Sequence, residues 1–143
     1  MGQIGPETLE GRVRVVGNAP FSWTVVEGAD GQSRIVSGAL RGEIRRLAGA
    51  HIRVTGRLVQ ADLPDTTLEA SSYEILSVDG DRPLLGRLER DAEGYYLTPQ
   101  EGLVRRVTFV SDQLAEQVGA LMWVVLDERG GIARYGILRD AAP

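Results

Sequence analysis

Apolar and polar residues alternate along most of this chain with a period of two, the pattern of β-strands that have one buried face. The runs predicted to be strands cover residues 9–16, 21–26, 32–36, 51–58 and 68–76, and then 84–90, 95–98 and 104–110. In the first run, the phase assigns Leu9, Gly11, Val13 and Val15 to the buried side. In the second run, it assigns Phe21 and Trp23 to the buried side and Ser22 and Thr24 to the outer side.

The period changes after the third strand. Leu40, Ile44 and Leu47 follow each other at helical spacing and predict a helix of about three turns. Ser37 is placed to cap its N-terminus, and Gly49 can end it in the left-handed conformation. The helix is therefore expected between the third and fourth strands.

The second half of the chain repeats this order in fewer residues. The matched segments are Gly11-Arg12-Val13 with Gly86-Arg87-Leu88, Val36-Ser37 with Val110-Ser111, Gly49-Ala50 with Gly119-Ala120, and Tyr73-Glu74-Ile75-Leu76 with Tyr135-Gly136-Ile137-Leu138. Each half is predicted to run β-β-β-α-β-β. A single larger barrel or β-sandwich, with the repeat arising by coincidence, is the rival architecture.

This element order, with its glycine-containing first strand and the segment GAHIRVTGRLVQADLPDTTLEASSYEIL, resembles the OB-fold, a five-stranded Greek-key barrel. The resemblance implies an all-β chain with short helices, made of two tandem OB-like barrels of which the second is smaller and could be incomplete. The expected divisions are a flexible arm over 1–8, a first barrel over 9–77, a linker over 78–83 and a second barrel over 84–143. It also implies a binding function for oligonucleotides or oligosaccharides.

Composition narrows the chemistry. The 143 residues include no cysteine and one histidine, so disulfides, thiolate chemistry and multi-histidine metal sites are excluded. Every basic residue is arginine, and the net charge of -4 argues against indiscriminate binding to polyanions. No apolar run could cross a membrane, and the N-terminus resembles no signal peptide. The chain is expected to be cytoplasmic, although a secreted chain without its signal peptide would have the same features.

Catalytic and cofactor signals are weak. Asp62 and Asp65 share a loop, but two carboxylates are too few ligands to predict a cation site. His51 lies on an outward strand face without a serine or aspartate nearby in sequence, so it is predicted to be a surface residue. We therefore expect a binding protein that is not an enzyme and that uses no metal or cofactor.

Arginines recur at outward positions of the first half. Counting by twos places five of them on one side of the first barrel: Arg12, Arg14, Arg34, Arg53 and Arg57. An OB domain can follow a phosphate backbone with such a face and stack bases on exposed rings. Single-stranded DNA or RNA is therefore the leading ligand, with Tyr96 or Trp123 as candidate stacking rings. An ordinary solvated face, which Glu10 would favour, is the competing interpretation.

The outward positions of the repeated fourth strand differ between the halves. His51 and Arg53 in the first half become Leu121 and Trp123 in the second, with Val125 two residues further on. A strand that is apolar on both sides should be covered on both. These three residues are therefore predicted to pack against the first half or another copy of the chain. The competing hypothesis is an aromatic docking site formed by Trp123, Tyr96, Arg87 and Arg106.

Two further functions stay open. The protein could be an interaction or assembly module that uses the strip of Leu121, Trp123 and Val125, with a protein partner or a homo-oligomer as the result. More distantly, it could bind a small ligand or an oligosaccharide through the loop 60–67.

Overall fold

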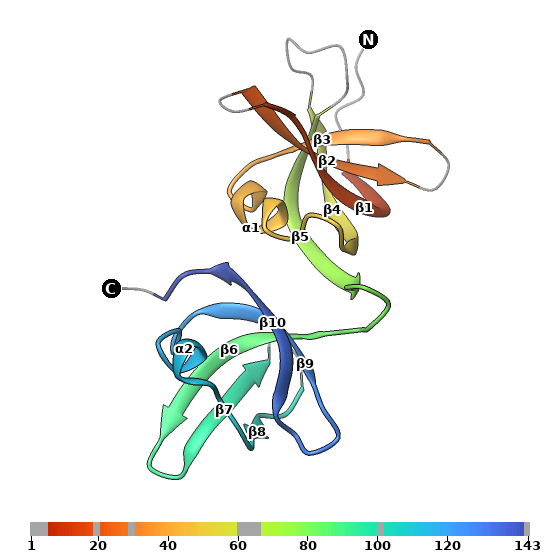
Figure 1. Ribbon diagram of the computed structural model, residues 1–143. Coiled ribbons are helices and arrows are strands. Elements are labelled where there is room, and N and C mark those ends of the chain that lie inside the picture. Colours follow the sequence, from red (N-terminus) through yellow and green to blue (C-terminus); the bar gives the residue numbers. More distant parts are fainter. Residues whose placement is uncertain (1–5, 19–20, 29–30, 60–66, 100–101, 142–143) are drawn as a thin grey trace. The chain divides into compact units, whose positions relative to one another are not determined.

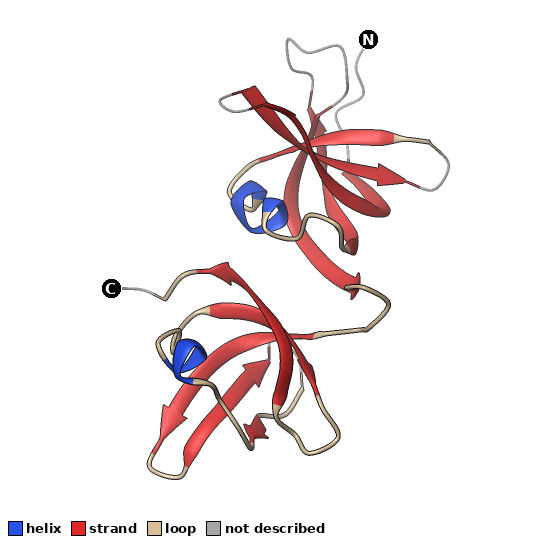
Figure 2. Cartoon of the chain, viewed as in Figure 1, coloured by secondary structure: helices blue, strands red, loops and turns tan. Residues whose placement is uncertain are grey.

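The computed structural model describes residues 6–18, 21–28, 31–59, 67–99 and 102–141. Internal contacts divide the chain into two compact units, Met1–Gly80 (unit 1) and Asp81–Pro143 (unit 2). The division falls inside the segment 78–83 that the sequence analysis assigned as a linker. Both units consist of strands with one short helix each, so an all-β chain with short helices is confirmed (Figure 2).

Unit 1 is a closed barrel with the strand order β1-β2-β3-β5-β4 (Figure 1). Its elements are β1 (Pro6–Asn18), β2 (Phe21–Gly28), β3 (Ser33–Ser37), α1 (Arg41–Arg45), β4 (His51–Val59) and β5 (Thr67–Ser77). Strand β4 returns to pair with β1, and β3 pairs with β5 in parallel, whereas the other pairs are antiparallel. The parallel pair closes the barrel.

Close approach of two backbones explains a glycine in the first strand. Gly11 faces Gly28 across β1 and β2, and a Cβ on Gly11 would overlap the carbonyl oxygen of Glu27. The barrel interior next to it contains Val13, Val26, Ile52, Val54 and Leu68, all fully buried. Any other residue at position 11 would push β1 and β2 apart.

Unit 2 is a five-stranded sheet with the order β10-β9-β6-β7-β8. Its elements are β6 (Leu84–Asp91), β7 (Gly94–Pro99), β8 (Arg105–Val107), α2 (Asp112–Ala115), β9 (Leu121–Leu126) and β10 (Ile132–Arg139). Within the described part of this unit, no strand pairing joins β8 to β10, so the sheet stays open where unit 1 closes. Strand β8 is also shorter than the run 104–110 predicted from alternation.

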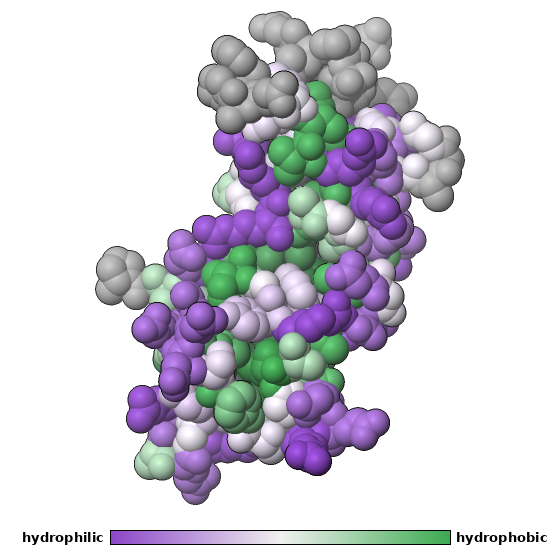
Figure 3. Space-filling view, viewed as in Figure 1, coloured by the Kyte–Doolittle hydropathy of each residue, from purple (hydrophilic) through white to green (hydrophobic). Residues whose placement is uncertain are grey.

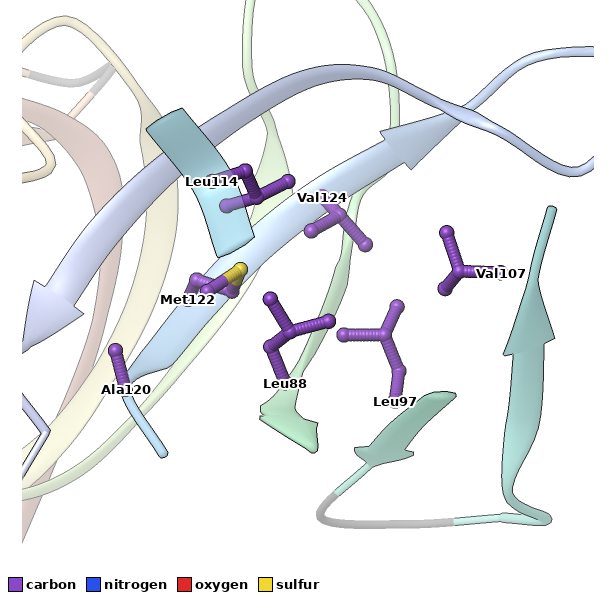
Figure 4. Packing of buried hydrophobic residues seen from close by; sticks show 7 residues of the cluster. All are labelled: Leu88, Leu97, Val107, Leu114, Ala120, Met122 and Val124. Atoms are coloured by element: carbon purple, nitrogen blue, oxygen red, sulfur yellow. The ribbon is translucent and has the colours of Figure 1, made fainter. Parts of the chain in front are cut away.

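The core of unit 2 is nevertheless continuous. Its buried members come from four strands, from α2 and from the residue before β9: Leu88, Leu97, Val107, Leu114, Ala120, Met122 and Val124 (Figure 4). Leu114 points from α2 toward Val124 and Met122, and in this view Leu88 of β6 lies between Met122 and Leu97 of β7. The short helix thus packs against the sheet through Leu114.

The two units share one pattern of backbone hydrogen bonds, which supports the repeat. A residue of the first strand is held between a glycine and an alanine that follow the helix. The residues that form these hydrogen bonds are Val13, Gly49 and Ala50 in unit 1, and Leu88, Gly119 and Ala120 in unit 2. The glycine N–H donates to the carbonyl oxygen of the first-strand residue, over 2.8 Å in unit 1 and 2.7 Å in unit 2. The N–H of the first-strand residue donates to the carbonyl oxygen of the alanine, over 3.0 Å and 3.3 Å, respectively. Both glycines have positive φ, as predicted for Gly49, but the first helix ends earlier than predicted, at Arg45, with Arg46 as its C-cap.

The start of the first helix was predicted wrongly. Residues 41–45 form only a short helix, and Leu40 occupies the N-cap without a side-chain hydrogen bond. Ser37 instead ends strand β3, because the parallel pair with β5 extends to it. In unit 2, the equivalent Ser111 does cap its helix by accepting a hydrogen bond from the N–H of Leu114.

The side assignment of the second strand was also wrong. Trp23 is 41% exposed, whereas Thr24 is only 3% exposed and lies inside the barrel. Val15 lies opposite Thr24 but is 36% exposed. Two adjacent valines, Val25 and Val26, explain the error, because either could have been the inward residue.

Candidate ligand-binding faces

The predicted arginine face of unit 1 is a ladder of opposite charges. Arg53 lies between Glu10 on β1 and Glu74 on β5 in the strand register. Its guanidinium bonds to the Glu10 carboxylate at 2.6 Å and to the Glu74 carboxylate at 2.9 Å. The hydrogen bond that Arg53 donates to Glu10, together with the negative charge of Glu10, raises the pKa of Arg53. Arg53 therefore stays charged and is compensated on both sides.

Two other outward arginines of unit 1 are also paired with glutamates. Arg14 bonds to Glu27 at 2.7 Å, and Arg57 faces Glu69 across β4 and β5 with 3.7 Å between nitrogen and oxygen. Arg12 is different. It lies between Glu27 and His51 in the register, yet it forms no ion pair with any residue that the structure describes.

Arg34 does not belong to this outward face. It pairs directly with the fully buried Val26, so its side chain leaves β3 on the inward side. There its guanidinium meets the carboxylate of Glu7 at 3.1 Å, and the Arg34 side chain is only 19% exposed. The prediction that placed Arg34 with the four other arginines was wrong, because it relied on counting through a strand whose phase was misassigned.

The outward face of unit 1 is therefore close to neutral. Its four arginines are offset by four glutamates, namely Glu10, Glu27, Glu69 and Glu74. Exposed ion pairs contribute little to stability, but they cancel the field that would attract a polyanion. Figure 3 shows polar side chains over much of the visible surface, with apolar side chains between them. The described residues of this face therefore do not form a broad basic surface.

An apolar row with an exposed ring crosses the outer side of β2 and β3. Trp23 pairs with Val16 of β1, and Val25 pairs with Ile35 of β3. Arg14 lies beside Val25 in the same register and brings a cation to the row. Sequence alternation missed Trp23 as a surface residue, although the adjacent valines after it were a sign that the phase was ambiguous.

Tyr96 of unit 2, the other predicted ring, already has a partner. The guanidinium of Arg106 lies 5.3 Å from the centre of the Tyr96 ring, in a cation–π contact. Arg106 is itself held by Asp91 at 2.5 Å and by Glu93 at 3.2 Å. The hydrogen bond from Arg106 lowers the pKa of Asp91 to about 2. The negative charge of Glu89 raises the pKa of Tyr96. One face of this ring is thus occupied.

The outward strip of β9 is partly covered within its own unit. Leu121 is buried, and Trp123 and Val125 are half-buried. The indole of Trp123 lies over Gly136 of β10, where a Cβ would overlap its ring. Arg87, assigned to the same docking surface, donates to the carbonyl oxygen of Gly119 at 3.1 Å. The covering of Leu121 and Val125 by another half or copy stays a prediction.

The remaining candidates give little to build on. Within the described residues, no group of three or more histidines or carboxylates could hold a metal ion. His51 is exposed and lies opposite Ser77 in the register of β4 and β5, but no hydrogen bond joins their side chains within the described strands. The loop 60–66, including Asp62 and Asp65, lies outside the described residues. Among the helices that can be described, none has the length and apolar character needed to span a membrane.

No protein-family model matches this chain, and neither a curated protein nor a solved structure matches it significantly.

Proposed function

We propose that this chain is a non-catalytic binding protein whose first unit is an OB-type barrel for single-stranded nucleic acid. The strand order β1-β2-β3-β5-β4, the parallel β3–β5 pair and the helix between β3 and β4 support this fold assignment. One observation carries the function: Trp23 exposes its ring on the outer side of β2, beside aliphatic residues and an arginine. Aromatic rings on such sheets stack bases.

The proposed site is smaller than the arginine face inferred from sequence. Trp23 provides the stacking surface, and Val16, Val25 and Ile35 provide an apolar floor along β1, β2 and β3. Arg12 and Arg14 lie on β1 beside this row, and Arg14 would exchange its pair with Glu27 for a phosphate. Arg53 and Arg57 lie on β4, on the other side of β1 from β2, and are not assigned to phosphate contacts.

The salt dependence of binding distinguishes the small site from the large one. Each phosphate contact on a single strand contributes about -0.7 to the slope of log K against log salt. Two contacts predict a slope of about -1.4, whereas the five arginines predicted from sequence would give about -3.5. The measurement is the anisotropy of labelled DNA and RNA oligonucleotides at several salt concentrations. Absence of binding to both at low salt would contradict the proposal.

Variants test the ring and the charges separately. Trp23→Ala should weaken binding by about 1–3 kcal/mol, the value of one stacked base. Arg12→Ala should flatten the salt slope, and Arg53→Ala is its matched control because its charge is already compensated. A chain with Trp123→Phe keeps Trp23 as its one tryptophan, so quenching of its fluorescence by the oligonucleotide reports stacking directly. Equal losses for Arg12→Ala and Arg53→Ala would argue against the small site.

A second candidate is an assembly module that uses the strip of Leu121, Trp123 and Val125. It is favoured by Trp123 and Val125, which stay partly exposed on the side of β9 opposite Met122 and Val124. Trp123→Asp should then give a folded protein with a changed molar mass in light scattering. Simple unfolding of the variant would assign Trp123 to the core of a monomer and would contradict the assembly function.

A further inference from the structure

The surface around Trp23 is almost entirely apolar. Trp23 is 41% exposed, and Val16 lies directly opposite it on β1. Val25 and Ile35 face each other across β2 and β3 on the same outer side. These residues together are named the Trp23 row. The indole N–H, which can only donate, is the one polar group among their side chains.

The nearest hydroxyl groups lie at the border of the row or beneath it. Ser33 and Ser37 each lie two residues from Ile35 on β3 and border the row. Thr67 pairs with Ile35 across β3 and β5, but it is only 4% exposed. Its hydroxyl is buried and has no hydrogen-bond partner among the described residues. A ligand that lies on the row therefore meets mainly carbon atoms.

This composition argues against two other classes of ligand that aromatic surfaces bind. An oligosaccharide needs hydrogen-bond partners for the hydroxyl groups that it buries, and the row has only the indole N–H. An extended peptide that binds as an added strand needs a free strand edge, whereas β2 and β3 are paired on both sides within the closed barrel. A base needs neither, because it stacks through its flat face.

Positive charge lies at one end of the row but does not choose among bases. Arg14 lies opposite Val25, and Arg12 lies opposite Glu27. Glu27 is paired with Arg14 at 2.7 Å, so these three charges leave one positive charge beside the row. Over the whole outer face, arginines and glutamates cancel. The selectivity of the row must therefore come from its apolar side chains.

We propose that the Trp23 row binds thymine bases of single-stranded DNA and holds their 5-methyl groups against Val16 and Ile35. This inference rests on the proposed function and names the base that the same site takes. Thymine carries a methyl group on its edge, and the uracil of RNA lacks it. Burying one methyl group changes affinity about fourfold, whereas the row provides no hydrogen-bond partners for reading the base edges. The preference for DNA over RNA thus follows from the methyl group.

The test compares short homopolymers of thymidine, deoxyuridine, ribothymidine and uridine on the full chain at low salt. Each competes with a fluorescein-labelled thymidine strand, and anisotropy reports its displacement. Both thymine strands should act at about fourfold lower concentration than both uracil strands. Equal potency of thymine and uracil, or a ranking set by the sugar, would overturn this inference and leave the proposed function standing. Failure of the labelled strand to bind would contradict the proposed function itself, and this inference with it.

Two neighbouring valines on β1 provide matched variants. Val16→Thr replaces a methyl group of the row by a hydroxyl of similar size, and it should lower the thymine-to-uracil ratio to about twofold or less. Ile35→Thr should act in the same direction. Val15→Thr makes the same change at a residue opposite the inward Thr24, and it should leave the ratio unchanged. Equal ratios for Val16→Thr and Val15→Thr would overturn the inference.

NMR locates the bound base directly. Nuclear Overhauser contacts are expected between the thymine methyl protons and the methyl groups of Val16 and Ile35. Thr67→Val removes the buried hydroxyl and should leave the thymine-to-uracil ratio unchanged, whereas a changed ratio would contradict recognition by apolar contact alone. Contacts confined to unit 2, or displacement of the strand by a neutral glucan or a proline-rich peptide, would assign the row to another occupant and overturn the inference.

Discussion

Unit 1 and unit 2 hold the first strand to the segment after the helix with equivalent hydrogen bonds, yet only unit 1 closes its sheet. Closure needs length: β3 and β5 have 5 and 11 residues, whereas β8 and β10 have 3 and 8. The outer faces differ as well, with charge pairs around Arg53 in unit 1 and the Trp123 ring lying over Gly136 in unit 2. Inward residues thus maintain the shared framework, and outward residues give each unit its own surface.

The buried apolar residue of each helix should show the largest effect on stability, and the effect should differ between the units. Ile44 in α1 and Leu114 in α2 are both fully buried. Ile44→Ala should destabilise unit 1 by about 4 kcal/mol, because a closed barrel cannot collapse around the cavity. Leu114→Ala should cost about 3 kcal/mol, since an open sheet can relax toward the smaller side chain.

Single-tryptophan variants make this comparison measurable. Urea unfolding followed through Trp23 reports unit 1, and unfolding followed through Trp123 reports unit 2. A larger loss for Leu114→Ala than for Ile44→Ala would argue that the open sheet is as rigid as the barrel.

Substitution of the first-strand glycine tests how closely the first two strands approach each other in each unit. A Cβ on Gly11 would overlap the Glu27 carbonyl oxygen, whereas one on Gly86 would lie 2.8 Å from the carbonyl oxygen of Thr98. Gly11→Ala should therefore cost about 3 kcal/mol and Gly86→Ala about 1 kcal/mol, the two ends of the usual range for overpacking.

Gly42→Ala is the matched control for these glycine variants. Gly42 lies in α1, and a Cβ there would meet no atom within 4 Å. Its replacement should stabilise unit 1 by about 0.5–1 kcal/mol, because alanine is the better helix former. Equal midpoints of urea unfolding for Gly11→Ala and Gly42→Ala would contradict the close approach of β1 and β2.

Sequence alone could predict the inward framework but not the outer faces. The strand periods and the glycine after each helix are local signals, and Gly49 has the predicted positive φ although the helix ends before it. The partners of an outward charge are not local: Glu10 and Arg53 are 43 residues apart and meet through strand register. Trp23 was misplaced because Val25 and Val26 left the phase undetermined. Charge compensation and the exposed ring therefore required the three-dimensional pairing of strands.

A smaller difference concerns two matched tyrosines. The hydroxyl of Tyr73 donates to the buried Glu43 carboxylate at 2.8 Å. Tyr135, its match in unit 2, is exposed, and its hydroxyl forms no hydrogen bond with the described residues. Tyr73→Phe should destabilise unit 1 by about 1.5 kcal/mol, the value of a hydrogen bond to a charged group, and Tyr135→Phe should be neutral. Urea unfolding of the two variants checks this, and equal losses would contradict the match.

The smallest effect is expected at the exposed pair of Asp91 and Arg106, which unit 2 has in place of the ladder around Arg53. Arg106 lowers the pKa of Asp91 from 3.8 to about 2. The pair therefore stabilises unit 2 fully above pH 3.8, and this contribution is lost as the pH falls through about 2. Arg106→Ala should raise the pKa of Asp91, although not completely, because the N–H of Glu93 still donates to this carboxylate at 2.9 Å.

Carbon NMR of the Asp91 carboxyl group measures this shift directly during an acid titration. Arg105→Ala is the matched control, because it removes the same charge from the neighbouring position of β8 without touching Asp91. Its Asp91 pKa should stay at about 2. An equal rise in both variants would mean that the net charge of unit 2, rather than the Arg106 hydrogen bond, holds the carboxylate ionised. The units would then differ in how they use charge: specific pairs across strands in unit 1 and a general field in unit 2.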